Sequence, residues 1–485
     1  MATPAKKPHL VFFPFPAQGH VTPAFHLASL LHHLHGFDVT FVHTEHNRRR
    51  LLRARGADAL AGSPGFRFVA VPDGLPASDE DAAQDMTALL LSLPTLVPHF
   101  KELVLSDELL ASTASCCLLV SDVVPVQRAA KEIGLPCASF WTSSASFFMA
   151  CHQFPQLAAK GLLPLKDAEQ LRNGYLESTV VDWVPGMPKM RLKDFPSFIR
   201  TTDPDDAIIA LTVSTVECHR TVPSAVIFHT FDELESQVLR EMSAILPPIY
   251  TIGPLPLLLR QAAGAGDGPA AVDMSGSTSL SKENRACLDW LDGKRANSVV
   301  FVSFGSIVKL TNEQVVELAW GLANSGCGFL WVIRSDQQRP VLPPEFLAAT
   351  EGRGCVTSWC PQPGVLRHAA VGAFLTHCGW NLMLESVSAG VPLLCWPGAA
   401  DQQTNCWLAC TGLRIGVEIG EDPRREDVEL AIRQVMGGDD RGEELRTSAT
   451  EWKEKAALAT KPGGSSWVNL ERLVNEVLTP LMHKP

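Results

Sequence analysis

Apolar runs of strand length alternate with helical segments along both halves of this chain. In the first half the runs read LVFF, DVTFVHT, FRFVAV, CLLVSD and PCASFW, and in the second half they read SVVFVSF, FLWVIR, GCVTSW and VGAFLTH. Strands that alternate with helices form parallel sheets that are covered by helices on both faces. We therefore predict an α/β chain with two doubly wound domains.

A change in composition separates the two halves. The segment from Gln261 to Ser281 is dominated by Ala, Gly, Ser and Asp, which is typical of a flexible linker. The chain of 485 residues is also too long for one ordinary core. We predict an N-terminal domain at 1–258, a flexible linker at 259–284, a C-terminal domain at 285–460 and a final helix at 461–485.

Composition excludes several classes of protein. A formal net charge of -11 argues against nucleic-acid binding, which needs a basic surface. The 13 cysteines lie mostly among apolar residues without a C-x-x-C pair, so we expect reduced, buried thiols. The apolar run near the N-terminus is too short and too rich in Pro for a signal peptide, and we expect no transmembrane segment. A cytoplasmic monomer is the expectation.

The first strand is followed by a loop and a helix. Thr22 is the expected N-cap of that helix, Pro23 suits its first position and Gly36 suits its end. His20 is then expected on the loop between strand and helix. Asp122 follows another apolar run, so both side chains would lie at carboxyl ends of parallel strands, where ligands bind in such sheets.

The stretch from Trp359 to Gln402 is the richest in hydrogen-bonding side chains. Val371 to His377 reads as a strand, Cys378 to Trp380 as a turn, and Asn381 to Ala389 as a helix that stops at Gly390. A helix that begins just beyond a strand offers unpaired N–H groups to a phosphate. Glu385, four residues after Asn381, could accept both hydroxyls of a ribose.

This stretch resembles the signature box of the plant secondary-product UDP-glycosyltransferases, and the sequences around His20 and Asp122 match the same family. The resemblance implies the GT-B fold, in which two doubly wound Rossmann-like domains face a cleft, with the last helix crossing back to the first domain. It also implies a donor site for UDP-glucose as co-substrate, with no cofactor. The donor-binding residues implied are Trp359, Cys360, Gln362, His377, Trp380, Asn381, Leu382, Glu385, Asp401 and Gln402.

The sequence departs from the family pattern in two places. Leu382 stands where the family commonly has Ser, so a hydroxyl expected near a phosphate is missing. One lost hydrogen bond to a charged group costs about 1.5–3 kcal/mol, which weakens donor binding without abolishing it. Gly398 and Ala399 replace bulky aromatics that are common there, which widens the space beside the sugar or the acceptor.

The expected reaction is glucosyl transfer with inversion to a small hydrophobic hydroxylated acceptor, without a metal. A base with a pKa near neutrality suits removal of the acceptor's proton, which favours His20, and Asp122 would orient it. By resemblance, Thr142 touches the sugar or acceptor, although it could equally cap a helix. Ser306, which could equally be a turn residue, is a further candidate for the diphosphate. We expect acceptor contacts from Phe15, Gln18 and Phe140.

The acceptor itself is left open. The segment around Arg191 to Leu257 is closest to the branch of the family that glucosylates cyanohydrins, terpenoids and cytokinins, and phenols also remain. Gln402 favours glucose, but another sugar is not excluded. Ser388 in SVSAG is a near match to a hydrolase elbow, but it would lie inside a helix and is rejected. A protein that binds a UDP-sugar or another small molecule with little turnover is the non-enzyme alternative.

Overall fold

The computed structural model describes residues 9–75, 85–106, 117–264, 283–305, 308–334 and 342–480. The chain divides into two compact units, described separately below. The first unit comprises Met1–Ala145, Leu211–Lys282 and Leu458–Pro485, and the second comprises Ser146–Ala210 and Glu283–Ala457. Residues 146–210, which fall inside the predicted domain 1–258, thus group with the second unit. Most of the predicted linker, at 265–282, lies outside the described residues.

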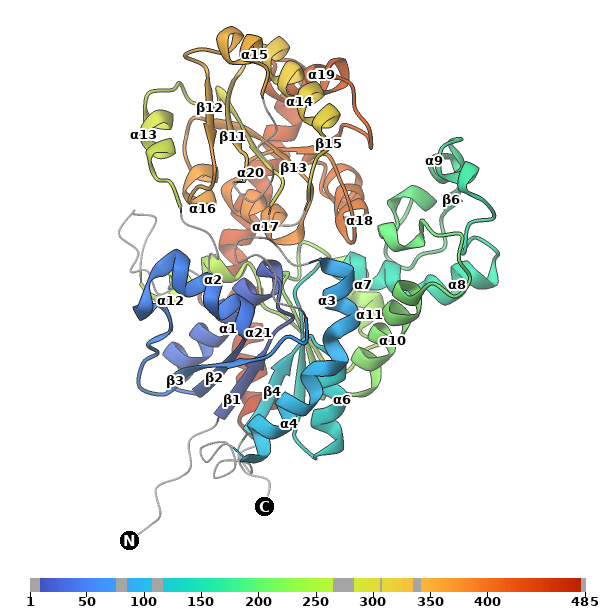
Figure 1. The fold of residues 1–485 in the computed structure, drawn as a ribbon, viewed down its shortest axis with the longest axis vertical. Helices are drawn as coiled ribbons and strands as arrows, with labels where there is room; N and C mark the ends of the chain where they lie inside the picture. Colours follow the sequence, from blue (N-terminus) through green and yellow to red (C-terminus); the bar gives the residue numbers. More distant parts are fainter. Residues whose placement is uncertain are drawn as a thin grey trace. The chain divides into compact units, whose positions relative to one another are not determined.

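A seven-stranded sheet forms the centre of the first unit (Figure 1). Its order is β3-β2-β1-β4-β5-β8-β9, and every neighbouring pair in it is parallel. The strands are β1 (His9–Phe13), β2 (Asp38–Thr44), β3 (Phe66–Val71), β4 (Cys117–Ser121), β5 (Cys137–Trp141), β8 (Ala225–Phe228) and β9 (Ile249–Thr251). The predicted doubly wound parallel sheet is confirmed for this half.

Helices cover both faces of this sheet because successive strand residues point to opposite sides. Leu10 and Phe12 pack in a core with α1 (Gln18–His35), α12 (Leu255–Ala262) and α21 (Ser465–Leu473). Val11 and Phe13 pack in a second core with α3 (Met86–Ser92), α4 (Leu96–Ser106) and α6 (Val124–Glu132). The further helices around this sheet are α2 (Glu45–Arg55), α10 (Ala207–Thr221) and α11 (Ser236–Met242). The continuous apolar strands noted in the sequence follow from this two-sided burial.

Among the described residues, the helical stretch Met86–Ser106 is long and apolar enough to cross a membrane, by length and composition alone. It contains α3 and α4 and the short 3₁₀ turn between them. Leu89, Leu93, Leu96 and Phe100 from this stretch pack in the core beside the sheet. Packing accounts for these four apolar side chains, whereas Leu91 and Leu105 of the same stretch are exposed.

The second unit has a six-stranded sheet, ordered β12-β11-β10-β13-β14-β15, with parallel neighbours. Its strands are β10 (Val299–Ser303), β11 (Gly328–Val332), β12 (Gly354–Thr357), β13 (Val371–Thr376), β14 (Leu393–Cys395) and β15 (Gly416–Glu418). Its helices are α13 (Ala286–Asp292), α14 (Asn312–Ser325), α15 (Pro344–Ala349), α16 (Gln362–Leu366), α17 (Trp380–Ala389), α18 (Gln402–Trp407), α19 (Arg425–Met436) and α20 (Asp440–Thr460). Val300 and Val302 pack against α14 and α19. The second predicted doubly wound sheet is confirmed as well.

Residues 146–210 add a less regular region to the second unit. It contains α7 (Ala145–His152), α8 (Phe154–Ala159), α9 (Tyr175–Ser178) and an antiparallel pair of short strands, β6 (Val180–Val181) and β7 (Met190–Arg191). Two 3₁₀ turns follow, at Leu192–Asp194 and Ser197–Ile199.

Several predicted helix ends are confirmed and one start is wrong. Gly36 and Gly390 end their helices in the left-handed conformation, with φ of 69° and 76°. Helix α1 begins at Gln18 instead of near Thr22, so Pro23 lies inside it and His20 lies in its first turn. The start moves because Ala17 O accepts the N–H of Val21, while the Thr22 hydroxyl accepts from Gln18 Nε2 instead of capping the helix.

The strand order places the candidate residues. In each sheet the order reverses between two central strands, which are β1 and β4 in the first unit and β10 and β13 in the second. Ligands bind beyond the carboxyl ends of the strands at such a reversal. The segments that follow these four strands carry His20, Asp122, Gly305 and His377.

Candidate active site

His20 and Asp122 meet at the reversal point of the first sheet. His20 Nδ1 lies 2.6 Å from Asp122 Oδ2, although the residues are 102 positions apart. The other carboxylate oxygen, Oδ1, accepts the backbone N–H of Phe15 at 2.6 Å, so both oxygens of Asp122 are anchored. A carboxylate accepts hydrogen bonds, so Nδ1 carries the proton and Nε2 is left to accept one. The Asp122 side chain is 8% exposed and that of His20 is 35% exposed, so the imidazole can be reached from solvent.

Thr142 and Phe15 complete the surroundings of His20. Thr142 Oγ1 lies 2.9 Å from His20 Nδ1, a contact that the sequence had not indicated. The ring of Phe15 packs against the imidazole, with 4.8 Å between ring centroids. Gln18 Nε2 donates to the hydroxyl of Thr22 at 2.6 Å. The side chains of Asp122, Thr142 and Phe15 come from different parts of the chain and together fix the orientation of the imidazole.

Phe140 requires a correction. It was predicted to touch the acceptor, but it is 2% exposed and belongs to the core between the sheet and α1 and α12. The alternation of side chains along β5 turns this residue toward the helices.

In the second unit, His377 directly follows β13 and is held between two glycines. A Cβ atom on Gly305 would lie 2.5 Å from His377 Cε1, and one on Gly379 would lie 2.6 Å from Nε2. Both distances are shorter than real Cβ contacts, so the imidazole fills the space that the glycines leave. Burial, together with the positive charge of Arg334, lowers the pKa of His377 to about 4. The ring is therefore neutral at physiological pH and carries a single N–H.

Arg334 is a residue of this region that the sequence reasoning missed. It follows β11, is 7% exposed, and donates from Nη1 to Gly305 O at 3.0 Å and from Nη2 to Val308 O at 3.5 Å. A charged residue directly after the apolar run FLWVI was the available signal, because it had to lie at the carboxyl end of a strand. Ser306 lies outside the described residues.

Several of the predicted donor residues lie on or near α16 and α17. Gln362 begins α16, and its Nε2 donates to Glu385 Oε2 at 2.6 Å. Burial raises the pKa of Glu385 to about 7. Trp359 is half-buried just before α16, while Cys360 is buried. The structure thus brings the side chains of Gln362 and Glu385 into direct hydrogen-bond contact.

Helix α17 begins at Trp380, one residue before the prediction. Trp380 is buried, while Asn381 and Leu382 are half-buried in the first turn of the helix. Cys378 adopts a left-handed φ of 65°, which turns the chain sharply from β13 into the helix. The first-turn N–H groups of α17 and His377 therefore lie at one end of the sheet, as an anion site requires.

Asp401 and Gln402 lie on the turn after β14. The N–H groups of Gly398 and Ala399 donate to Gln402 Oε1 at 2.8 and 2.9 Å. Because Oε1 is the atom that accepts these bonds, the Nε2 amide of Gln402 is the group that could donate to a ligand. Asn405 Nδ2 donates to Asp401 Oδ2 at 2.8 Å and so orients the carboxylate.

Three buried thiols also meet in this unit. The sulfur atoms of Cys378, Cys395 and Cys406 lie within 4.8 Å of one another, a separation that could suit a metal ion. Burial raises the pKa of the Cys378 thiol well above its ordinary range. Neutral thiols behave as small apolar groups, and we assign these to packing. Ser388 donates to Leu384 O within α17, which agrees with the rejection of a hydrolase elbow.

Comparison with known proteins identifies the family of this chain. Residues 269–447 match the family model described as UDP-glucoronosyl and UDP-glucosyl transferase. The chain is 48% identical to a 7-deoxyloganetin glucosyltransferase of Gardenia jasminoides, with 98% of each chain covered. It is 46% identical to an (R)-mandelonitrile beta-glucosyltransferase of Prunus dulcis, again with 98% of each covered.

Among solved structures, the chain is similar to a UDP-glucosyltransferase from Polygonum tinctorium that is described as capable of glucosylating indoxyl. The identity is 29% and the TM-score is 0.78, with 99% of this chain and 100% of that chain covered. The two parallel sheets and this similarity identify the GT-B fold. The chain therefore belongs to the UDP-glucoronosyl and UDP-glucosyl transferase family and is a UDP-glycosyltransferase, related to plant enzymes that glucosylate small metabolites.

Proposed function

We propose that this enzyme transfers glucose from UDP-glucose, with inversion, to a hydroxyl group of a small hydrophobic metabolite, and that His20 is the general base. The observation that carries the proposal is the contact of 2.6 Å between His20 Nδ1 and Asp122 Oδ2. It leaves Nε2 to take the acceptor's proton, while Asp122 stabilises the imidazolium that forms. Thr142 and Phe15 hold the ring in this orientation.

The donor is assigned to the second unit. Trp359 would stack on uracil, with Cys360 and Gln362 beside the uracil or ribose, and Glu385 would accept the ribose hydroxyls. The diphosphate would meet His377, Ser306 and the first turn of α17, which contains Trp380, Asn381 and Leu382. Asp401 and Gln402 would bind the hydroxyls of glucose.

The departing UDP carries negative charge that must be stabilised. The N-terminal end of α17 supplies a fixed dipole for this charge, so we propose a reaction that needs no metal. Attack by the acceptor oxygen on the sugar face opposite the leaving group inverts the anomeric centre. An α-linked donor then gives a β-O-glucoside.

The acceptor class follows from the relatives. Two of them are named as glucosyltransferases of 7-deoxyloganetin and of (R)-mandelonitrile. We propose a small, largely apolar alcohol for this enzyme and a cytoplasmic monomer as its working form. Which alcohol it takes is a question for a panel of acceptors.

Release of UDP from UDP-glucose over a panel of terpenoid, phenolic and cyanohydrin alcohols, without added metal, tests the proposal. We expect acceptor-dependent release that falls by roughly 10²–10⁴-fold in His20→Ala, because a general base contributes about that factor. His33→Ala is the matched control, since His33 lies on the same helix and its Nδ1 bonds to Ser29 O. UDP affinity should be equal in all three proteins.

Three results would count against the proposal in different ways. Unchanged release in His20→Ala would overturn the base assignment. Release with UDP-galactose or UDP-xylose but not with UDP-glucose would change the sugar. UDP-glucose binding without release from any acceptor would favour a binding protein with little turnover.

A further inference from the structure

The turn that carries Asp401 and Gln402 has an unusual backbone. Ala400, immediately before Asp401, has a φ of 59°, in the left-handed region that side chains other than Gly, Asn and Asp rarely adopt. Hydrogen bonds from Gly398 N and Ala399 N to Gln402 Oε1 close the turn from within. Such a strained residue persists where surrounding contacts hold it.

Ser197 supplies those contacts from 203 residues away in the sequence. The N–H of Ala400 donates to Ser197 Oγ at 2.7 Å, and the N–H of Ser197 donates to Ala400 O at 3.1 Å. Both polar backbone groups of Ala400 are therefore paired with one residue. A two-bond contact of this kind fixes the orientation of the peptide groups on either side of Ala400.

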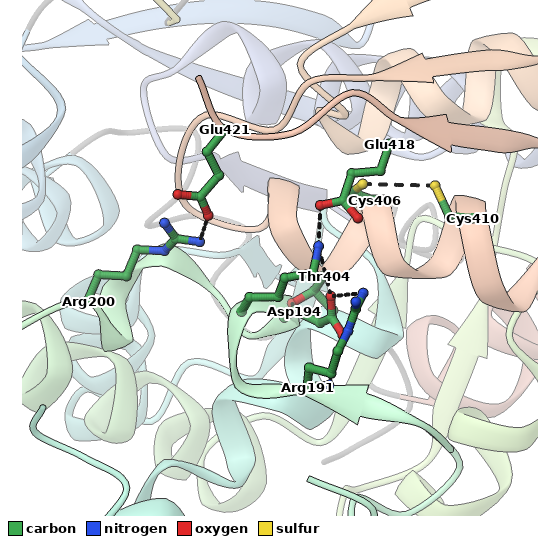
Figure 2. Close-up of polar contacts among 9 residues, drawn as sticks. Arg191, Asp194, Arg200, Thr404, Cys406, Cys410, Glu418 and Glu421 are labelled. Atoms are coloured by element: carbon green, nitrogen blue, oxygen red, sulfur yellow. Dashed lines mark hydrogen bonds and ion pairs between the residues drawn. The ribbon is translucent and has the colours of Figure 1, made fainter. Parts of the chain in front are cut away.

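Neighbouring contacts hold the same segment in place, and we name residues 191–200 the clasp. Lys193 pairs with Glu418, and Arg200 pairs with Glu421; Figure 2 shows the second of these pairs. Thr404 Oγ1, on α18, donates to Asp194 O at 2.9 Å. The clasp thus reaches β15, the segment after it, and the helix that follows the turn.

Asp194 fixes the shape of the clasp itself. Its side chain is 4% exposed, and its carboxylate accepts from Arg191 N at 2.8 Å and from the Arg191 guanidinium at 3.2 and 3.3 Å. A buried carboxylate is retained at low cost only when it is paired in this way. These bonds therefore hold the clasp in one conformation and so fix the position of Ser197.

We propose that Ser197 is a positioning residue for recognition of the sugar. By holding Ala400 in its left-handed conformation, it directs Asp401 and Gln402 toward the hexose of the donor. This inference rests on the proposed function, which assigns these two side chains to the sugar. It adds that part of the sugar specificity comes from residues 191–200, outside the stretch Trp359 to Gln402.

The test compares binding of UDP-glucose with binding of UDP by titration calorimetry without acceptor. Ser197→Ala removes the hydroxyl that accepts from Ala400 N, and Thr404→Val removes the second contact with a side chain of equal shape. We expect Ser197→Ala to weaken UDP-glucose binding roughly tenfold, as expected for loss of a buried hydrogen bond, and to leave the Kd of UDP unchanged. Thr404→Val should act in the same direction.

Ser325→Ala is the matched control. Ser325 is a half-buried serine of the same unit that bonds to Leu322 O and Cys327 N, beyond the segments that carry the proposed donor residues. It should leave both dissociation constants unchanged. Equal losses of UDP and UDP-glucose binding in Ser197→Ala would show general damage and overturn the inference, as would no loss in either.

Asp401→Asn separates this inference from the proposed function. If Asp401→Asn weakens UDP-glucose but not UDP, while Ser197→Ala changes neither, then the sugar assignment holds and the role of Ser197 is wrong. If Asp401→Asn also changes neither, the assignment of the sugar site fails and the inference fails with it. A parallel Tm measurement on each variant shows that the protein compared is folded.

Discussion

Gln362 Nε2 donates a hydrogen bond of 2.6 Å to Glu385 Oε2, which joins the first residue of α16 to the second turn of α17. The bond stabilises the ionised carboxylate, but burial acts more strongly and raises the pKa of Glu385 to about 7. The carboxyl group therefore changes charge within the physiological range.

This pKa predicts how donor binding depends on pH. If Glu385 accepts the ribose hydroxyls, UDP binds the ionised form, and the group must lose its proton on binding. We expect the Kd of UDP to be nearly constant above about pH 8 and to rise about tenfold per unit well below pH 7. Calorimetric titration from pH 5.5 to 8.5 measures this, since the pKa of His377, about 4, lies below the window.

Glu385→Gln is the control for that profile, because it carries no titrating proton. Its UDP affinity should be low and flat across the same pH range. A slope that survives in Glu385→Gln would assign the titration to another group.

The pair of Asp122 with His20 predicts the effect of an isosteric change. Asp122→Asn keeps the shape but replaces the acceptor that holds the proton on Nδ1, so the tautomer with a basic Nε2 is no longer favoured. We expect kcat to fall by roughly 10²–10⁴-fold with little change in the KM for UDP-glucose. Steady-state kinetics on the best acceptor of the panel measure both constants, and a kcat within twofold of wild type would contradict the assignment.

The packing of Gly305 against His377 predicts that a side chain at position 305 lowers the affinity for UDP. Gly305→Ala places a Cβ 2.5 Å from the imidazole and also imposes a side chain at φ of 65°. Gly326→Ala is the control for the backbone effect alone. Gly326 has a φ of 75°, and nothing lies within 4 Å of the added Cβ atom. We expect both variants to lose about 1–2 kcal/mol of unfolding free energy from the backbone, and only Gly305→Ala to lose UDP affinity as well. Equal UDP affinity in the two variants would place His377 away from the diphosphate.

The side chain at position 382 leads to a prediction of improved donor binding. It lies half-buried in the first turn of α17, where a hydroxyl could reach a phosphate that is bound at the helix N-terminus. Leu382→Ser should lower the KM for UDP-glucose by about tenfold, which corresponds to one added hydrogen bond to a charged group. Leu382→Ala controls for the loss of side-chain volume, and an equal KM in the two variants would mean that the backbone N–H groups already satisfy the phosphate.

Much of the fold could be predicted because its signals are local. The alternation of apolar runs with helical segments predicted both parallel sheets, and the glycines at 36 and 390 predicted helix ends. Each of these depends on residues within one or two turns of chain, where spacing and backbone preference decide the outcome. The start of α1 was wrong because Ala17, Gln18 and Thr22 made bonds that no propensity indicates.

The sequence by itself determined which residue types stand at the ends of strands, and hence the family and the candidate groups. It also predicted that Asp122 orients His20, whereas only the tertiary structure decided the remaining contacts. The strand order sets β1 beside β4, which joins His20 to Asp122 across 102 residues and adds Thr142 from β5's end. The tertiary structure also pairs Ser197 with Ala400 across 203 residues and directs the side chain of Phe140 into the core. Such contacts depend on the three-dimensional order of elements, and periodicity along the chain carries no information about that order.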